Sequence, residues 1–165
     1  MSRAFTRESD APEALPERPA GPHPVYVTPA GLAQLRTRAE ALRRELEAAQ
    51  ERADAAAVQA LARDLRWLDS RVAGAVTVDP AAQPRDRVAF GAEVEVEDAA
   101  GAVRRWHIVG EDEVDIAAGR VSWISPLARA LDGARVGDTV LWSRPAGAQA
   151  LTVRAIRYPG AGPAR

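Results

Sequence analysis

Apolar residues recur at helical spacing over residues 28–76, and this is the clearest pattern in the chain. A first stripe has spacings of 3, 4, 3, 4, 3 and 4 along Leu32, Leu35, Ala39, Leu42, Leu46, Ala49 and Ala53. A second stripe has spacings of 3, 4, 3, 4 and 3 along Val58, Leu61, Leu65, Leu68, Val72 and Ala75. A heptad seam of this kind predicts helices that pack against other helices along their length.

The two stripes are out of phase, because the step from Ala53 to Val58 is 5 residues. One straight helix would place the stripes on different faces, so the sequence predicts a helical hairpin whose arms pack against each other. Thr28 and Pro29 suit the start of the outgoing arm, and Asp54 suits the N-cap of the returning arm. An unbroken helix that forms an intermolecular coiled coil is the competing interpretation.

The pattern changes to alternation after residue 77, which predicts strands. Strands are expected over Val88–Phe90 continuing through Val94 and Val96, and over Val103–Val109, Val121–Ile124, Thr139–Trp142 and Leu151–Tyr158. Ser125 and Pro126 suit the start of one short helix, which Gly133 ends. The predicted fold class is therefore α+β, an N-terminal antiparallel helical hairpin followed by a mainly antiparallel β domain with one short helix.

Four segments are expected along the chain: a flexible Pro-rich arm at 1–25, the hairpin at 26–77, a C-terminal domain at 78–158 and a disordered tail at 159–165. The arm contains five prolines and few large apolar residues. Such a segment buries too little surface to offset the entropy lost on ordering.

Composition removes several classes of function. The 165 residues have a formal net charge of −1, so no strong bulk attraction to nucleic acid or anionic membranes is expected. Cysteine is absent, and every cationic side chain is arginine, which excludes disulfides, a Cys nucleophile and Schiff-base chemistry. No apolar run approaches the roughly 18 residues of a membrane span, and the start lacks a secretory signal. We expect a cytoplasmic protein, monomeric and without membrane contact.

The residues that carry chemistry form no catalytic constellation. His23 and His107 lack a second metal ligand at a suitable spacing, and His107 is expected to be an exposed strand residue. The stretch Glu111–Asp115 lacks the spacing of a calcium loop and is interpreted as a solvated acidic loop. We therefore expect no enzyme activity, no cofactor and no metal site.

Two features of the returning arm allow more than one interpretation. Arg63, Arg66 and Arg71 are interpreted as a solvated helix face, with contact to RNA or a protein partner as the alternative. Trp67 lies off the apolar seam, and packing against the C-terminal domain is preferred to an exposed anchor for a partner.

Several stretches resemble the GreA/GreB bacterial transcript-cleavage (elongation) factors. The resemblance covers about residues 26–158, including Tyr26–Gly31, Val76–Asp79, Arg87–Val94, Ile108–Glu113, Ser122–Leu131 and Val136–Asp138. It implies that the C-terminal domain has an FKBP-like fold without prolyl isomerase activity. It also implies that this domain binds RNA polymerase at the secondary channel while the coiled coil enters the pore.

The same resemblance indicates which residues would dock on the polymerase. The matching positions are Ser122, Ile124, Ser125, Pro126 and Leu127. Any contact with transcript RNA or with DNA is expected only within the polymerase complex.

The tip of the hairpin departs from the family pattern. Cleavage-stimulating members have a Leu-x-Glu-Asn-Ala-Glu-Tyr motif, whose carboxylates help to hold a second Mg²⁺ in the polymerase active site. The turn region here, Gln50–Ala57, lacks that motif, and Glu51 and Asp54 are its only carboxylates. The arms, about 35 Å long, are also several helical turns shorter than those of the cleavage-stimulating members.

These observations favour a Gre-like regulator of transcription elongation that occupies the secondary channel with weak or no stimulation of cleavage. The alternative is a non-transcriptional interaction module, such as a regulator of nucleoside diphosphate kinase or a dimerising scaffold. An isomerase acting through the C-terminal domain is a third, weaker interpretation.

Overall fold

The computed structural model of the chain describes residues 15–19 and 21–160. Its helices and strands are, in chain order, β1 (Val25–Val27), α1 (Pro29–Glu51), α2 (Ala55–Ala73), β2 (Ala75–Thr77), η1 (Pro80–Ala82), β3 (Glu93–Asp98), β4 (Val103–Val109), η2 (Glu111–Glu113), β5 (Arg120–Ser122), α3 (Pro126–Leu131), β6 (Thr139–Trp142) and β7 (Gln149–Arg157). Most of the predicted arm and of the predicted tail, residues 1–14, 20 and 161–165, lies outside the described residues.

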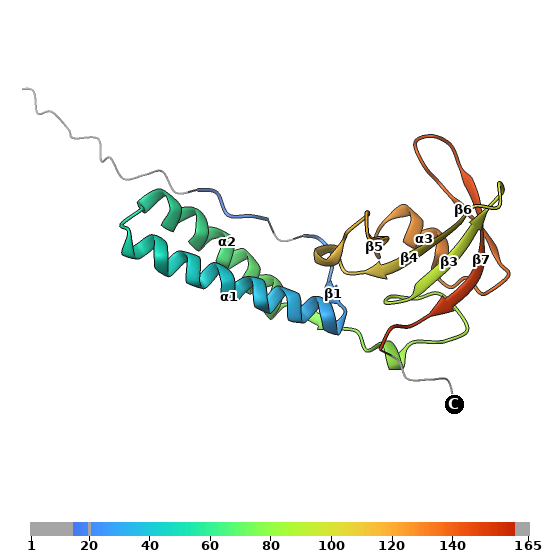
Figure 1. The fold of residues 1–165 in the computed structure, drawn as a ribbon, viewed down its shortest axis with the longest axis horizontal. Helices are drawn as coiled ribbons and strands as arrows, with labels where there is room; N and C mark the ends of the chain where they lie inside the picture. The colour runs from blue at the N-terminus through green and yellow to red at the C-terminus, as the bar shows by residue number, and fades with distance from the viewer. Residues whose placement is uncertain (1–14, 20, 161–165) are drawn as a thin grey trace, which may run out of the picture.

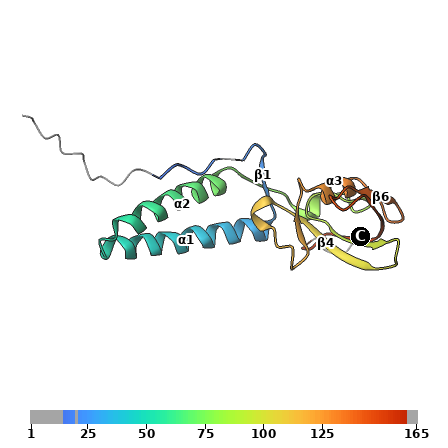
Figure 2. The same ribbon diagram turned by 90° about the horizontal axis from the view of Figure 1, so that it is seen from above.

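Helices α1 and α2 form the predicted hairpin, which projects from the sheet domain as a rod (Figures 1 and 2). Leu35 and Ala39 of the first stripe and Leu68 of the second are buried in one apolar cluster. The two stripes therefore face each other within one molecule, and the unbroken helix is excluded. Burial of this seam, and not helix propensity alone, stabilises the rod.

The turn between the arms lies where the change of phase predicts it. Helix α1 ends at Glu51, and the Asp54 side chain accepts a hydrogen bond from the Ala57 amide at 3.0 Å, which caps α2. Ala53, the last residue of the first stripe, lies in the turn with φ of 54°. Glycine usually adopts this left-handed conformation; because alanine adopts it here, no Gly or Pro marks the turn in the sequence.

A two-stranded parallel sheet closes the base of the hairpin. β1 enters α1, β2 leaves α2, and Val25 and Val27 pair with Ala75 and Thr77. The sequence did not predict this sheet, because strands of three residues show no measurable alternation.

The second unit is a five-stranded sheet of order β5-β4-β3-β7-β6. Its pairs are antiparallel except for β4 with β5, which confirms the predicted mainly antiparallel sheet. Helix α3 covers one face, where Leu127 and Leu131 share one buried apolar cluster with Val94, Val96 and Val153.

One predicted strand is wrong in part. Residues Val88–Phe90 precede the turn at Gly91 and lie outside β3, which begins at Glu93. The Val88 amide donates to the Ala134 carbonyl, and its carbonyl accepts from the Gly133 amide, so its partners lie beyond α3. Val88 is nevertheless buried in the core, which accounts for its apolar character.

Candidate functional site

The hairpin is joined to the sheet domain by one buried carboxylate. Glu113 in η2 accepts hydrogen bonds from the Thr28 amide at 3.0 Å, the Thr28 hydroxyl and the Gly110 amide at 3.1 Å. The Thr28 hydroxyl also caps α1 by accepting from the Gly31 amide at 2.9 Å. Glu113 thus binds the first turn of the rod to the end of β4, and we call this set of contacts the joint.

Two glycines make the joint possible. A Cβ atom on Gly31 would overlap the Glu113 carboxylate, and one on Gly110 would overlap the Tyr26 carbonyl. Gly31 is an unfavourable residue inside a helix, so its presence in the first turn of α1 reflects this close approach. The joint brings together two of the stretches, Tyr26–Gly31 and Ile108–Glu113, that carry the family resemblance.

A second contact connects α2 to η2, the short 3-10 helix that contains Glu113. Arg71 donates to Asp112 from Nε at 2.9 Å and from Nη2 at 2.6 Å, and its Nη2 lies 3.9 Å from Glu111. Arg71 is 7% exposed, so the interpretation of Arg71 as part of a solvated face is wrong. The interpretation of Glu111–Asp115 as a solvated acidic loop is likewise wrong for Asp112 and Glu113. Asp112 pairs with Arg71 of α2, and Glu113 accepts from Thr28 at the start of α1.

The predicted docking segment lies directly beside the joint. Trp123 packs edge-on against Tyr26 with ring centroids 5.1 Å apart, and Tyr26 in turn lies 6.1 Å from Phe90. Ser122 accepts from the Ile124 amide, and Ser125 caps α3 through the Ala128 amide. These bonds fix the loop that presents residues 122–126.

The five predicted docking residues differ in accessibility. Pro126 is exposed, and Ser122, Ile124 and Ser125 are partly buried. Leu127 is 3% exposed and packs in the core of the sheet domain, so its side chain is not available for docking. Helix α3 places Leu127 inward because it is the second residue after the Ser125 cap, on the face that covers the sheet.

The tip residues lie at the far end of the rod. Glu51 and Asp54 are both exposed, on either side of the turn. One Asp54 oxygen is occupied by the α2 cap, and Arg52 lies between the two carboxylates in the chain. The tip therefore offers a metal ion one free carboxylate and one that already serves as a cap.

His107 lies at the other side of the joint, in a crevice lined by Thr28, Pro29, Pro80 and Gly91. It is half-buried, so the expectation of an exposed strand residue is wrong. Burial lowers the pKa of His107 below its ordinary value of 6.5, and the charges of Glu93 and Glu113 oppose part of that shift.

Trp67 packs, as the sequence favoured, but it packs on the hairpin, so the expected packing against the sheet domain is wrong. Its ring packs on the apolar cluster of the hairpin. Arg63 and Arg66, on the same arm, pair with Asp64 and Glu17.

Within the described ranges, no group of three or more His, Asp or Glu is placed to hold a metal ion. No helix of that part is long and apolar enough to cross a membrane.

Fold and site together define a class of protein, in which a stiff helical hairpin is fixed rigidly to an α+β sheet domain. The family described as "Transcription elongation factor, GreA/GreB, C-term" matches residues 83–158. Residues 83–158 are therefore similar to the C-terminal domain of the GreA/GreB transcription elongation factors.

Two relatives illustrate the extent of the match. Transcription elongation factor GreB of Neisseria meningitidis serogroup A is 41% identical over 97 residues, 58% of this chain and 60% of that protein. Transcription elongation factor GreA of Ralstonia nicotianae is 40% identical over 93 residues, 55% of this chain and 59% of that protein. The chain spans about three fifths of the length of these relatives.

Among solved structures, GreA factor homolog 1 (Gfh1) of Thermus thermophilus matches 82% of this chain and 99% of its own, at 24% identity and a TM-score of 0.39.

Proposed function

We propose that this protein regulates transcription elongation by binding bacterial RNA polymerase in the cytoplasm and placing its hairpin in the secondary channel. The observation that carries the proposal is the rigid joint, since it fixes a rod to a domain that is similar to the C-terminal domain of the GreA/GreB factors. The loop that would dock, residues 122–126, lies against that joint. A partner that holds this loop would therefore also set the direction of the rod.

The tip supports a regulator with weak or no stimulation of transcript cleavage. A second catalytic Mg²⁺ needs carboxylate oxygens that are free to coordinate it. Here Asp54 caps α2 through one oxygen, and Arg52 brings a positive charge to the turn. The protein would then act by occupying the channel and not as an enzyme, and it would touch RNA or DNA only inside the polymerase complex.

Binding to core RNA polymerase tests the first part of the proposal. Ile124→Asp places a charge in the docking loop and is expected to weaken binding by about tenfold or more, which corresponds to roughly 1.4 kcal/mol. Leu141→Asp is the matched control, because Leu141 is 71% exposed on β6, away from the loop. Binding that both variants retain would contradict the assigned loop. Recovery of another partner in place of the polymerase would favour a non-transcriptional module.

Transcript cleavage in stalled complexes tests the second part. We expect little cleavage above that of the polymerase alone. Glu51→Ala combined with Asp54→Asn removes both tip charges, and asparagine is also a good N-cap, so α2 is retained. Strong cleavage by the wild type that this double variant abolishes would contradict the proposal.

A further inference from the structure

Residues 15–19 and 21–24, the described part of the stretch that precedes β1, contact the hairpin. Figures 1 and 2 both show these residues running along α2 toward the base of the rod. We call them the strap. Its contacts fall in two places, one midway along α2 and one at the docking loop.

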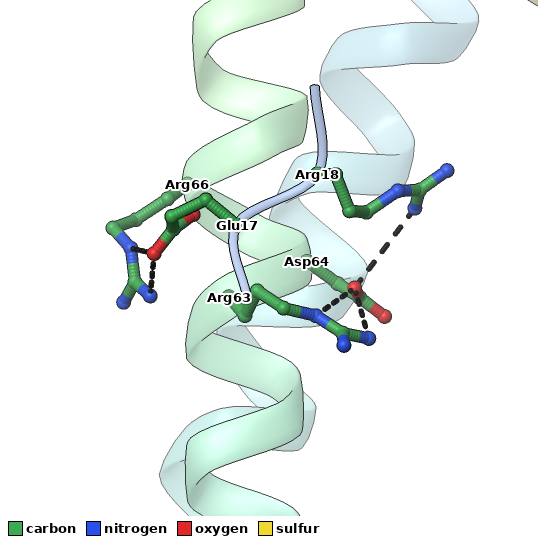
Figure 3. A network of polar contacts seen from close by, with 5 residues as sticks. All are labelled: Glu17, Arg18, Arg63, Asp64 and Arg66. Atoms are coloured by element: carbon green, nitrogen blue, oxygen red, sulfur yellow. Dashed lines mark hydrogen bonds and ion pairs between the residues drawn. The ribbon is translucent and has the colours of Figure 1, made fainter. Parts of the chain in front are cut away.

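Midway along α2, the strap makes ion pairs with two residues of the helix. Glu17 accepts from Arg66 Nε at 3.1 Å, and Arg18 lies 3.9 Å from Asp64 (Figure 3). Asp64 also pairs with Arg63 at 3.0 Å, so Arg18 completes a small charge network. The two neighbouring strap residues thus pair with a base and an acid that lie two positions apart on α2, on opposite flanks of the helix (Figure 3).

Trp67 provides the centre of this contact. The Arg18 guanidinium lies over the indole ring at 3.9 Å from its centroid, in the geometry of a cation–π interaction. Arg18 also lines a hollow between the two arms together with Arg38, Leu42 and Asp64. This contact accounts for a tryptophan that lies off the seam of the hairpin.

At the base, the strap reaches the docking loop. The His23 ring packs edge-on against Trp123 with centroids 6.0 Å apart. Gly21 passes the joint, where a Cβ atom would lie 3.9 Å from Arg71 Nη1. The strap therefore covers part of both surfaces on which the proposed function depends, the flank of the rod and the side of the loop at Trp123.

The strap is held weakly enough to leave. Glu17 and Arg66 are both well exposed, so water and salt screen their ion pair. Pro16, Pro19, Pro22 and Pro24 restrict the free strap, which reduces the entropy lost when it docks. Because its contacts are weak and the free segment is already restricted, the strap can bind the hairpin reversibly.

We propose that the strap is autoinhibitory: in the free protein it occupies Trp67 and Trp123, and binding of RNA polymerase displaces it. The choice of RNA polymerase as the displacing partner rests on the proposed function. The docked position of the strap, its seat, rests on the intramolecular contacts alone. The seat is therefore tested in the free protein first.

The chain has no cysteine, so two introduced thiols are the only ones present. Glu17→Cys with Arg66→Cys is treated with a short, reducible bis-maleimide linker. We expect rapid intramolecular cross-linking that slows at high salt. Glu17→Cys with Glu40→Cys is the control, because Glu40 is an exposed residue of the other arm, on the opposite face from Arg38. Equal rates for the two pairs would overturn the proposed seat.

Affinity for core RNA polymerase tests the inhibition. Glu17→Ala with Arg18→Ala is expected to bind about three- to tenfold more tightly than the wild type, since the polymerase no longer has to displace the strap. Glu95→Ala with Arg105→Ala, which removes an exposed ion pair of the sheet domain, should leave the affinity unchanged. The cross-linked E17C/R66C protein should bind more weakly and recover when the linker is reduced.

The outcomes separate the two proposals. If the locked and released proteins bind the polymerase equally, autoinhibition is overturned and the proposed function stands. If neither the wild type nor the released variant binds, the proposed function fails and autoinhibition fails with it. The cross-linking rates decide the seat of the strap in either case.

Discussion

Ala53 determines how the hairpin turns. It is the one residue other than glycine with positive φ in the described part of the chain, and it lies between the end of α1 and the Asp54 cap. An L-residue with a Cβ atom is disfavoured in this conformation by about 1–2 kcal/mol. The turn is therefore formed against a local preference and is stabilised by the seam that follows it.

Relief of this strain gives a first prediction. Ala53→Gly should raise the free energy of unfolding by about 1 kcal/mol, because glycine adopts positive φ without the steric cost. The gain is reduced in part by the greater freedom of glycine in the unfolded chain. Urea denaturation measures the change. Ala53→Val should have the opposite sign, and a turn without strain would give no difference between the two variants.

His107 gives a second prediction, on pH. Its pKa is lowered in the folded protein, so the unfolded chain binds the proton more tightly. The free energy of unfolding should therefore be highest above the ordinary pKa of 6.5 and fall as the pH drops through the folded-state value.

Denaturation of the wild type and of His107→Gln between about pH 8 and pH 5.5 measures this contribution. The variant should have the shallower slope. Parallel curves for the two proteins would show that His107 contributes nothing to the pH dependence.

Single residues were also where the sequence was least informative. Arg71 and Glu113 are charged residues of types that are usually solvated, and their partners lie 41 and 85 residues away along the chain. Nothing local distinguishes them from the exposed arginines and glutamates nearby. The available signal was indirect: Gly31 inside a helical pattern and Gly110 before an acidic stretch both mark close approaches of the backbone.

At the scale of elements, the hairpin could be predicted in detail because its information is local. The seam has a measurable period, and the cap at Asp54 lies next to the change of phase. β1 and β2 could not be predicted, since each is three residues long and pairs across the whole hairpin. For the candidate site, the resemblance indicated five docking residues, but the burial of Leu127 depends on how α3 packs on the sheet and has no local signal.

The Asp54 cap provides the third prediction. Asp54→Ala should destabilise the hairpin by about 1 kcal/mol, because the amides of the first turn of α2 lose their acceptor. Asp54→Asn should retain most of the stability, since asparagine caps as well as aspartate does. Amide hydrogen exchange over residues 55–58 measures the effect. Equal exchange in both variants would show that the stability is lost with the negative charge of Asp54 and not with its capping hydrogen bond.

At the scale of the whole molecule, the joint sets the direction of the rod relative to the sheet domain. α1 is held through Thr28 and Glu113, and α2 through Arg71 and Asp112. Both contacts converge on η2, so the two arms are fixed to the same three-residue helix. A single such contact would leave the rod free to rotate about it.

The ion pair between Arg71 and Asp112 gives the fourth prediction. Arg71→Ala leaves Asp112 largely buried without its partner, and the expected loss is about 3–5 kcal/mol. Arg71→Ala with Asp112→Ala should lose less than the single change, because no charge is left uncompensated. Denaturation of the four proteins of this double-mutant cycle measures the coupling. Additive losses would show that the pair does not act as a unit.

The parallel pairing of β1 with β2 has a consequence for how proteins of this design can change. Because both ends of the hairpin are fastened at one place, seven residues added to or removed from each arm shift the tip by about 10 Å and keep the heptad phase. The length of the rod can therefore change while its attachment to the sheet domain stays the same. A short rod with a weakly acidic tip and a long rod with an acidic tip could be attached to the sheet domain in the same way.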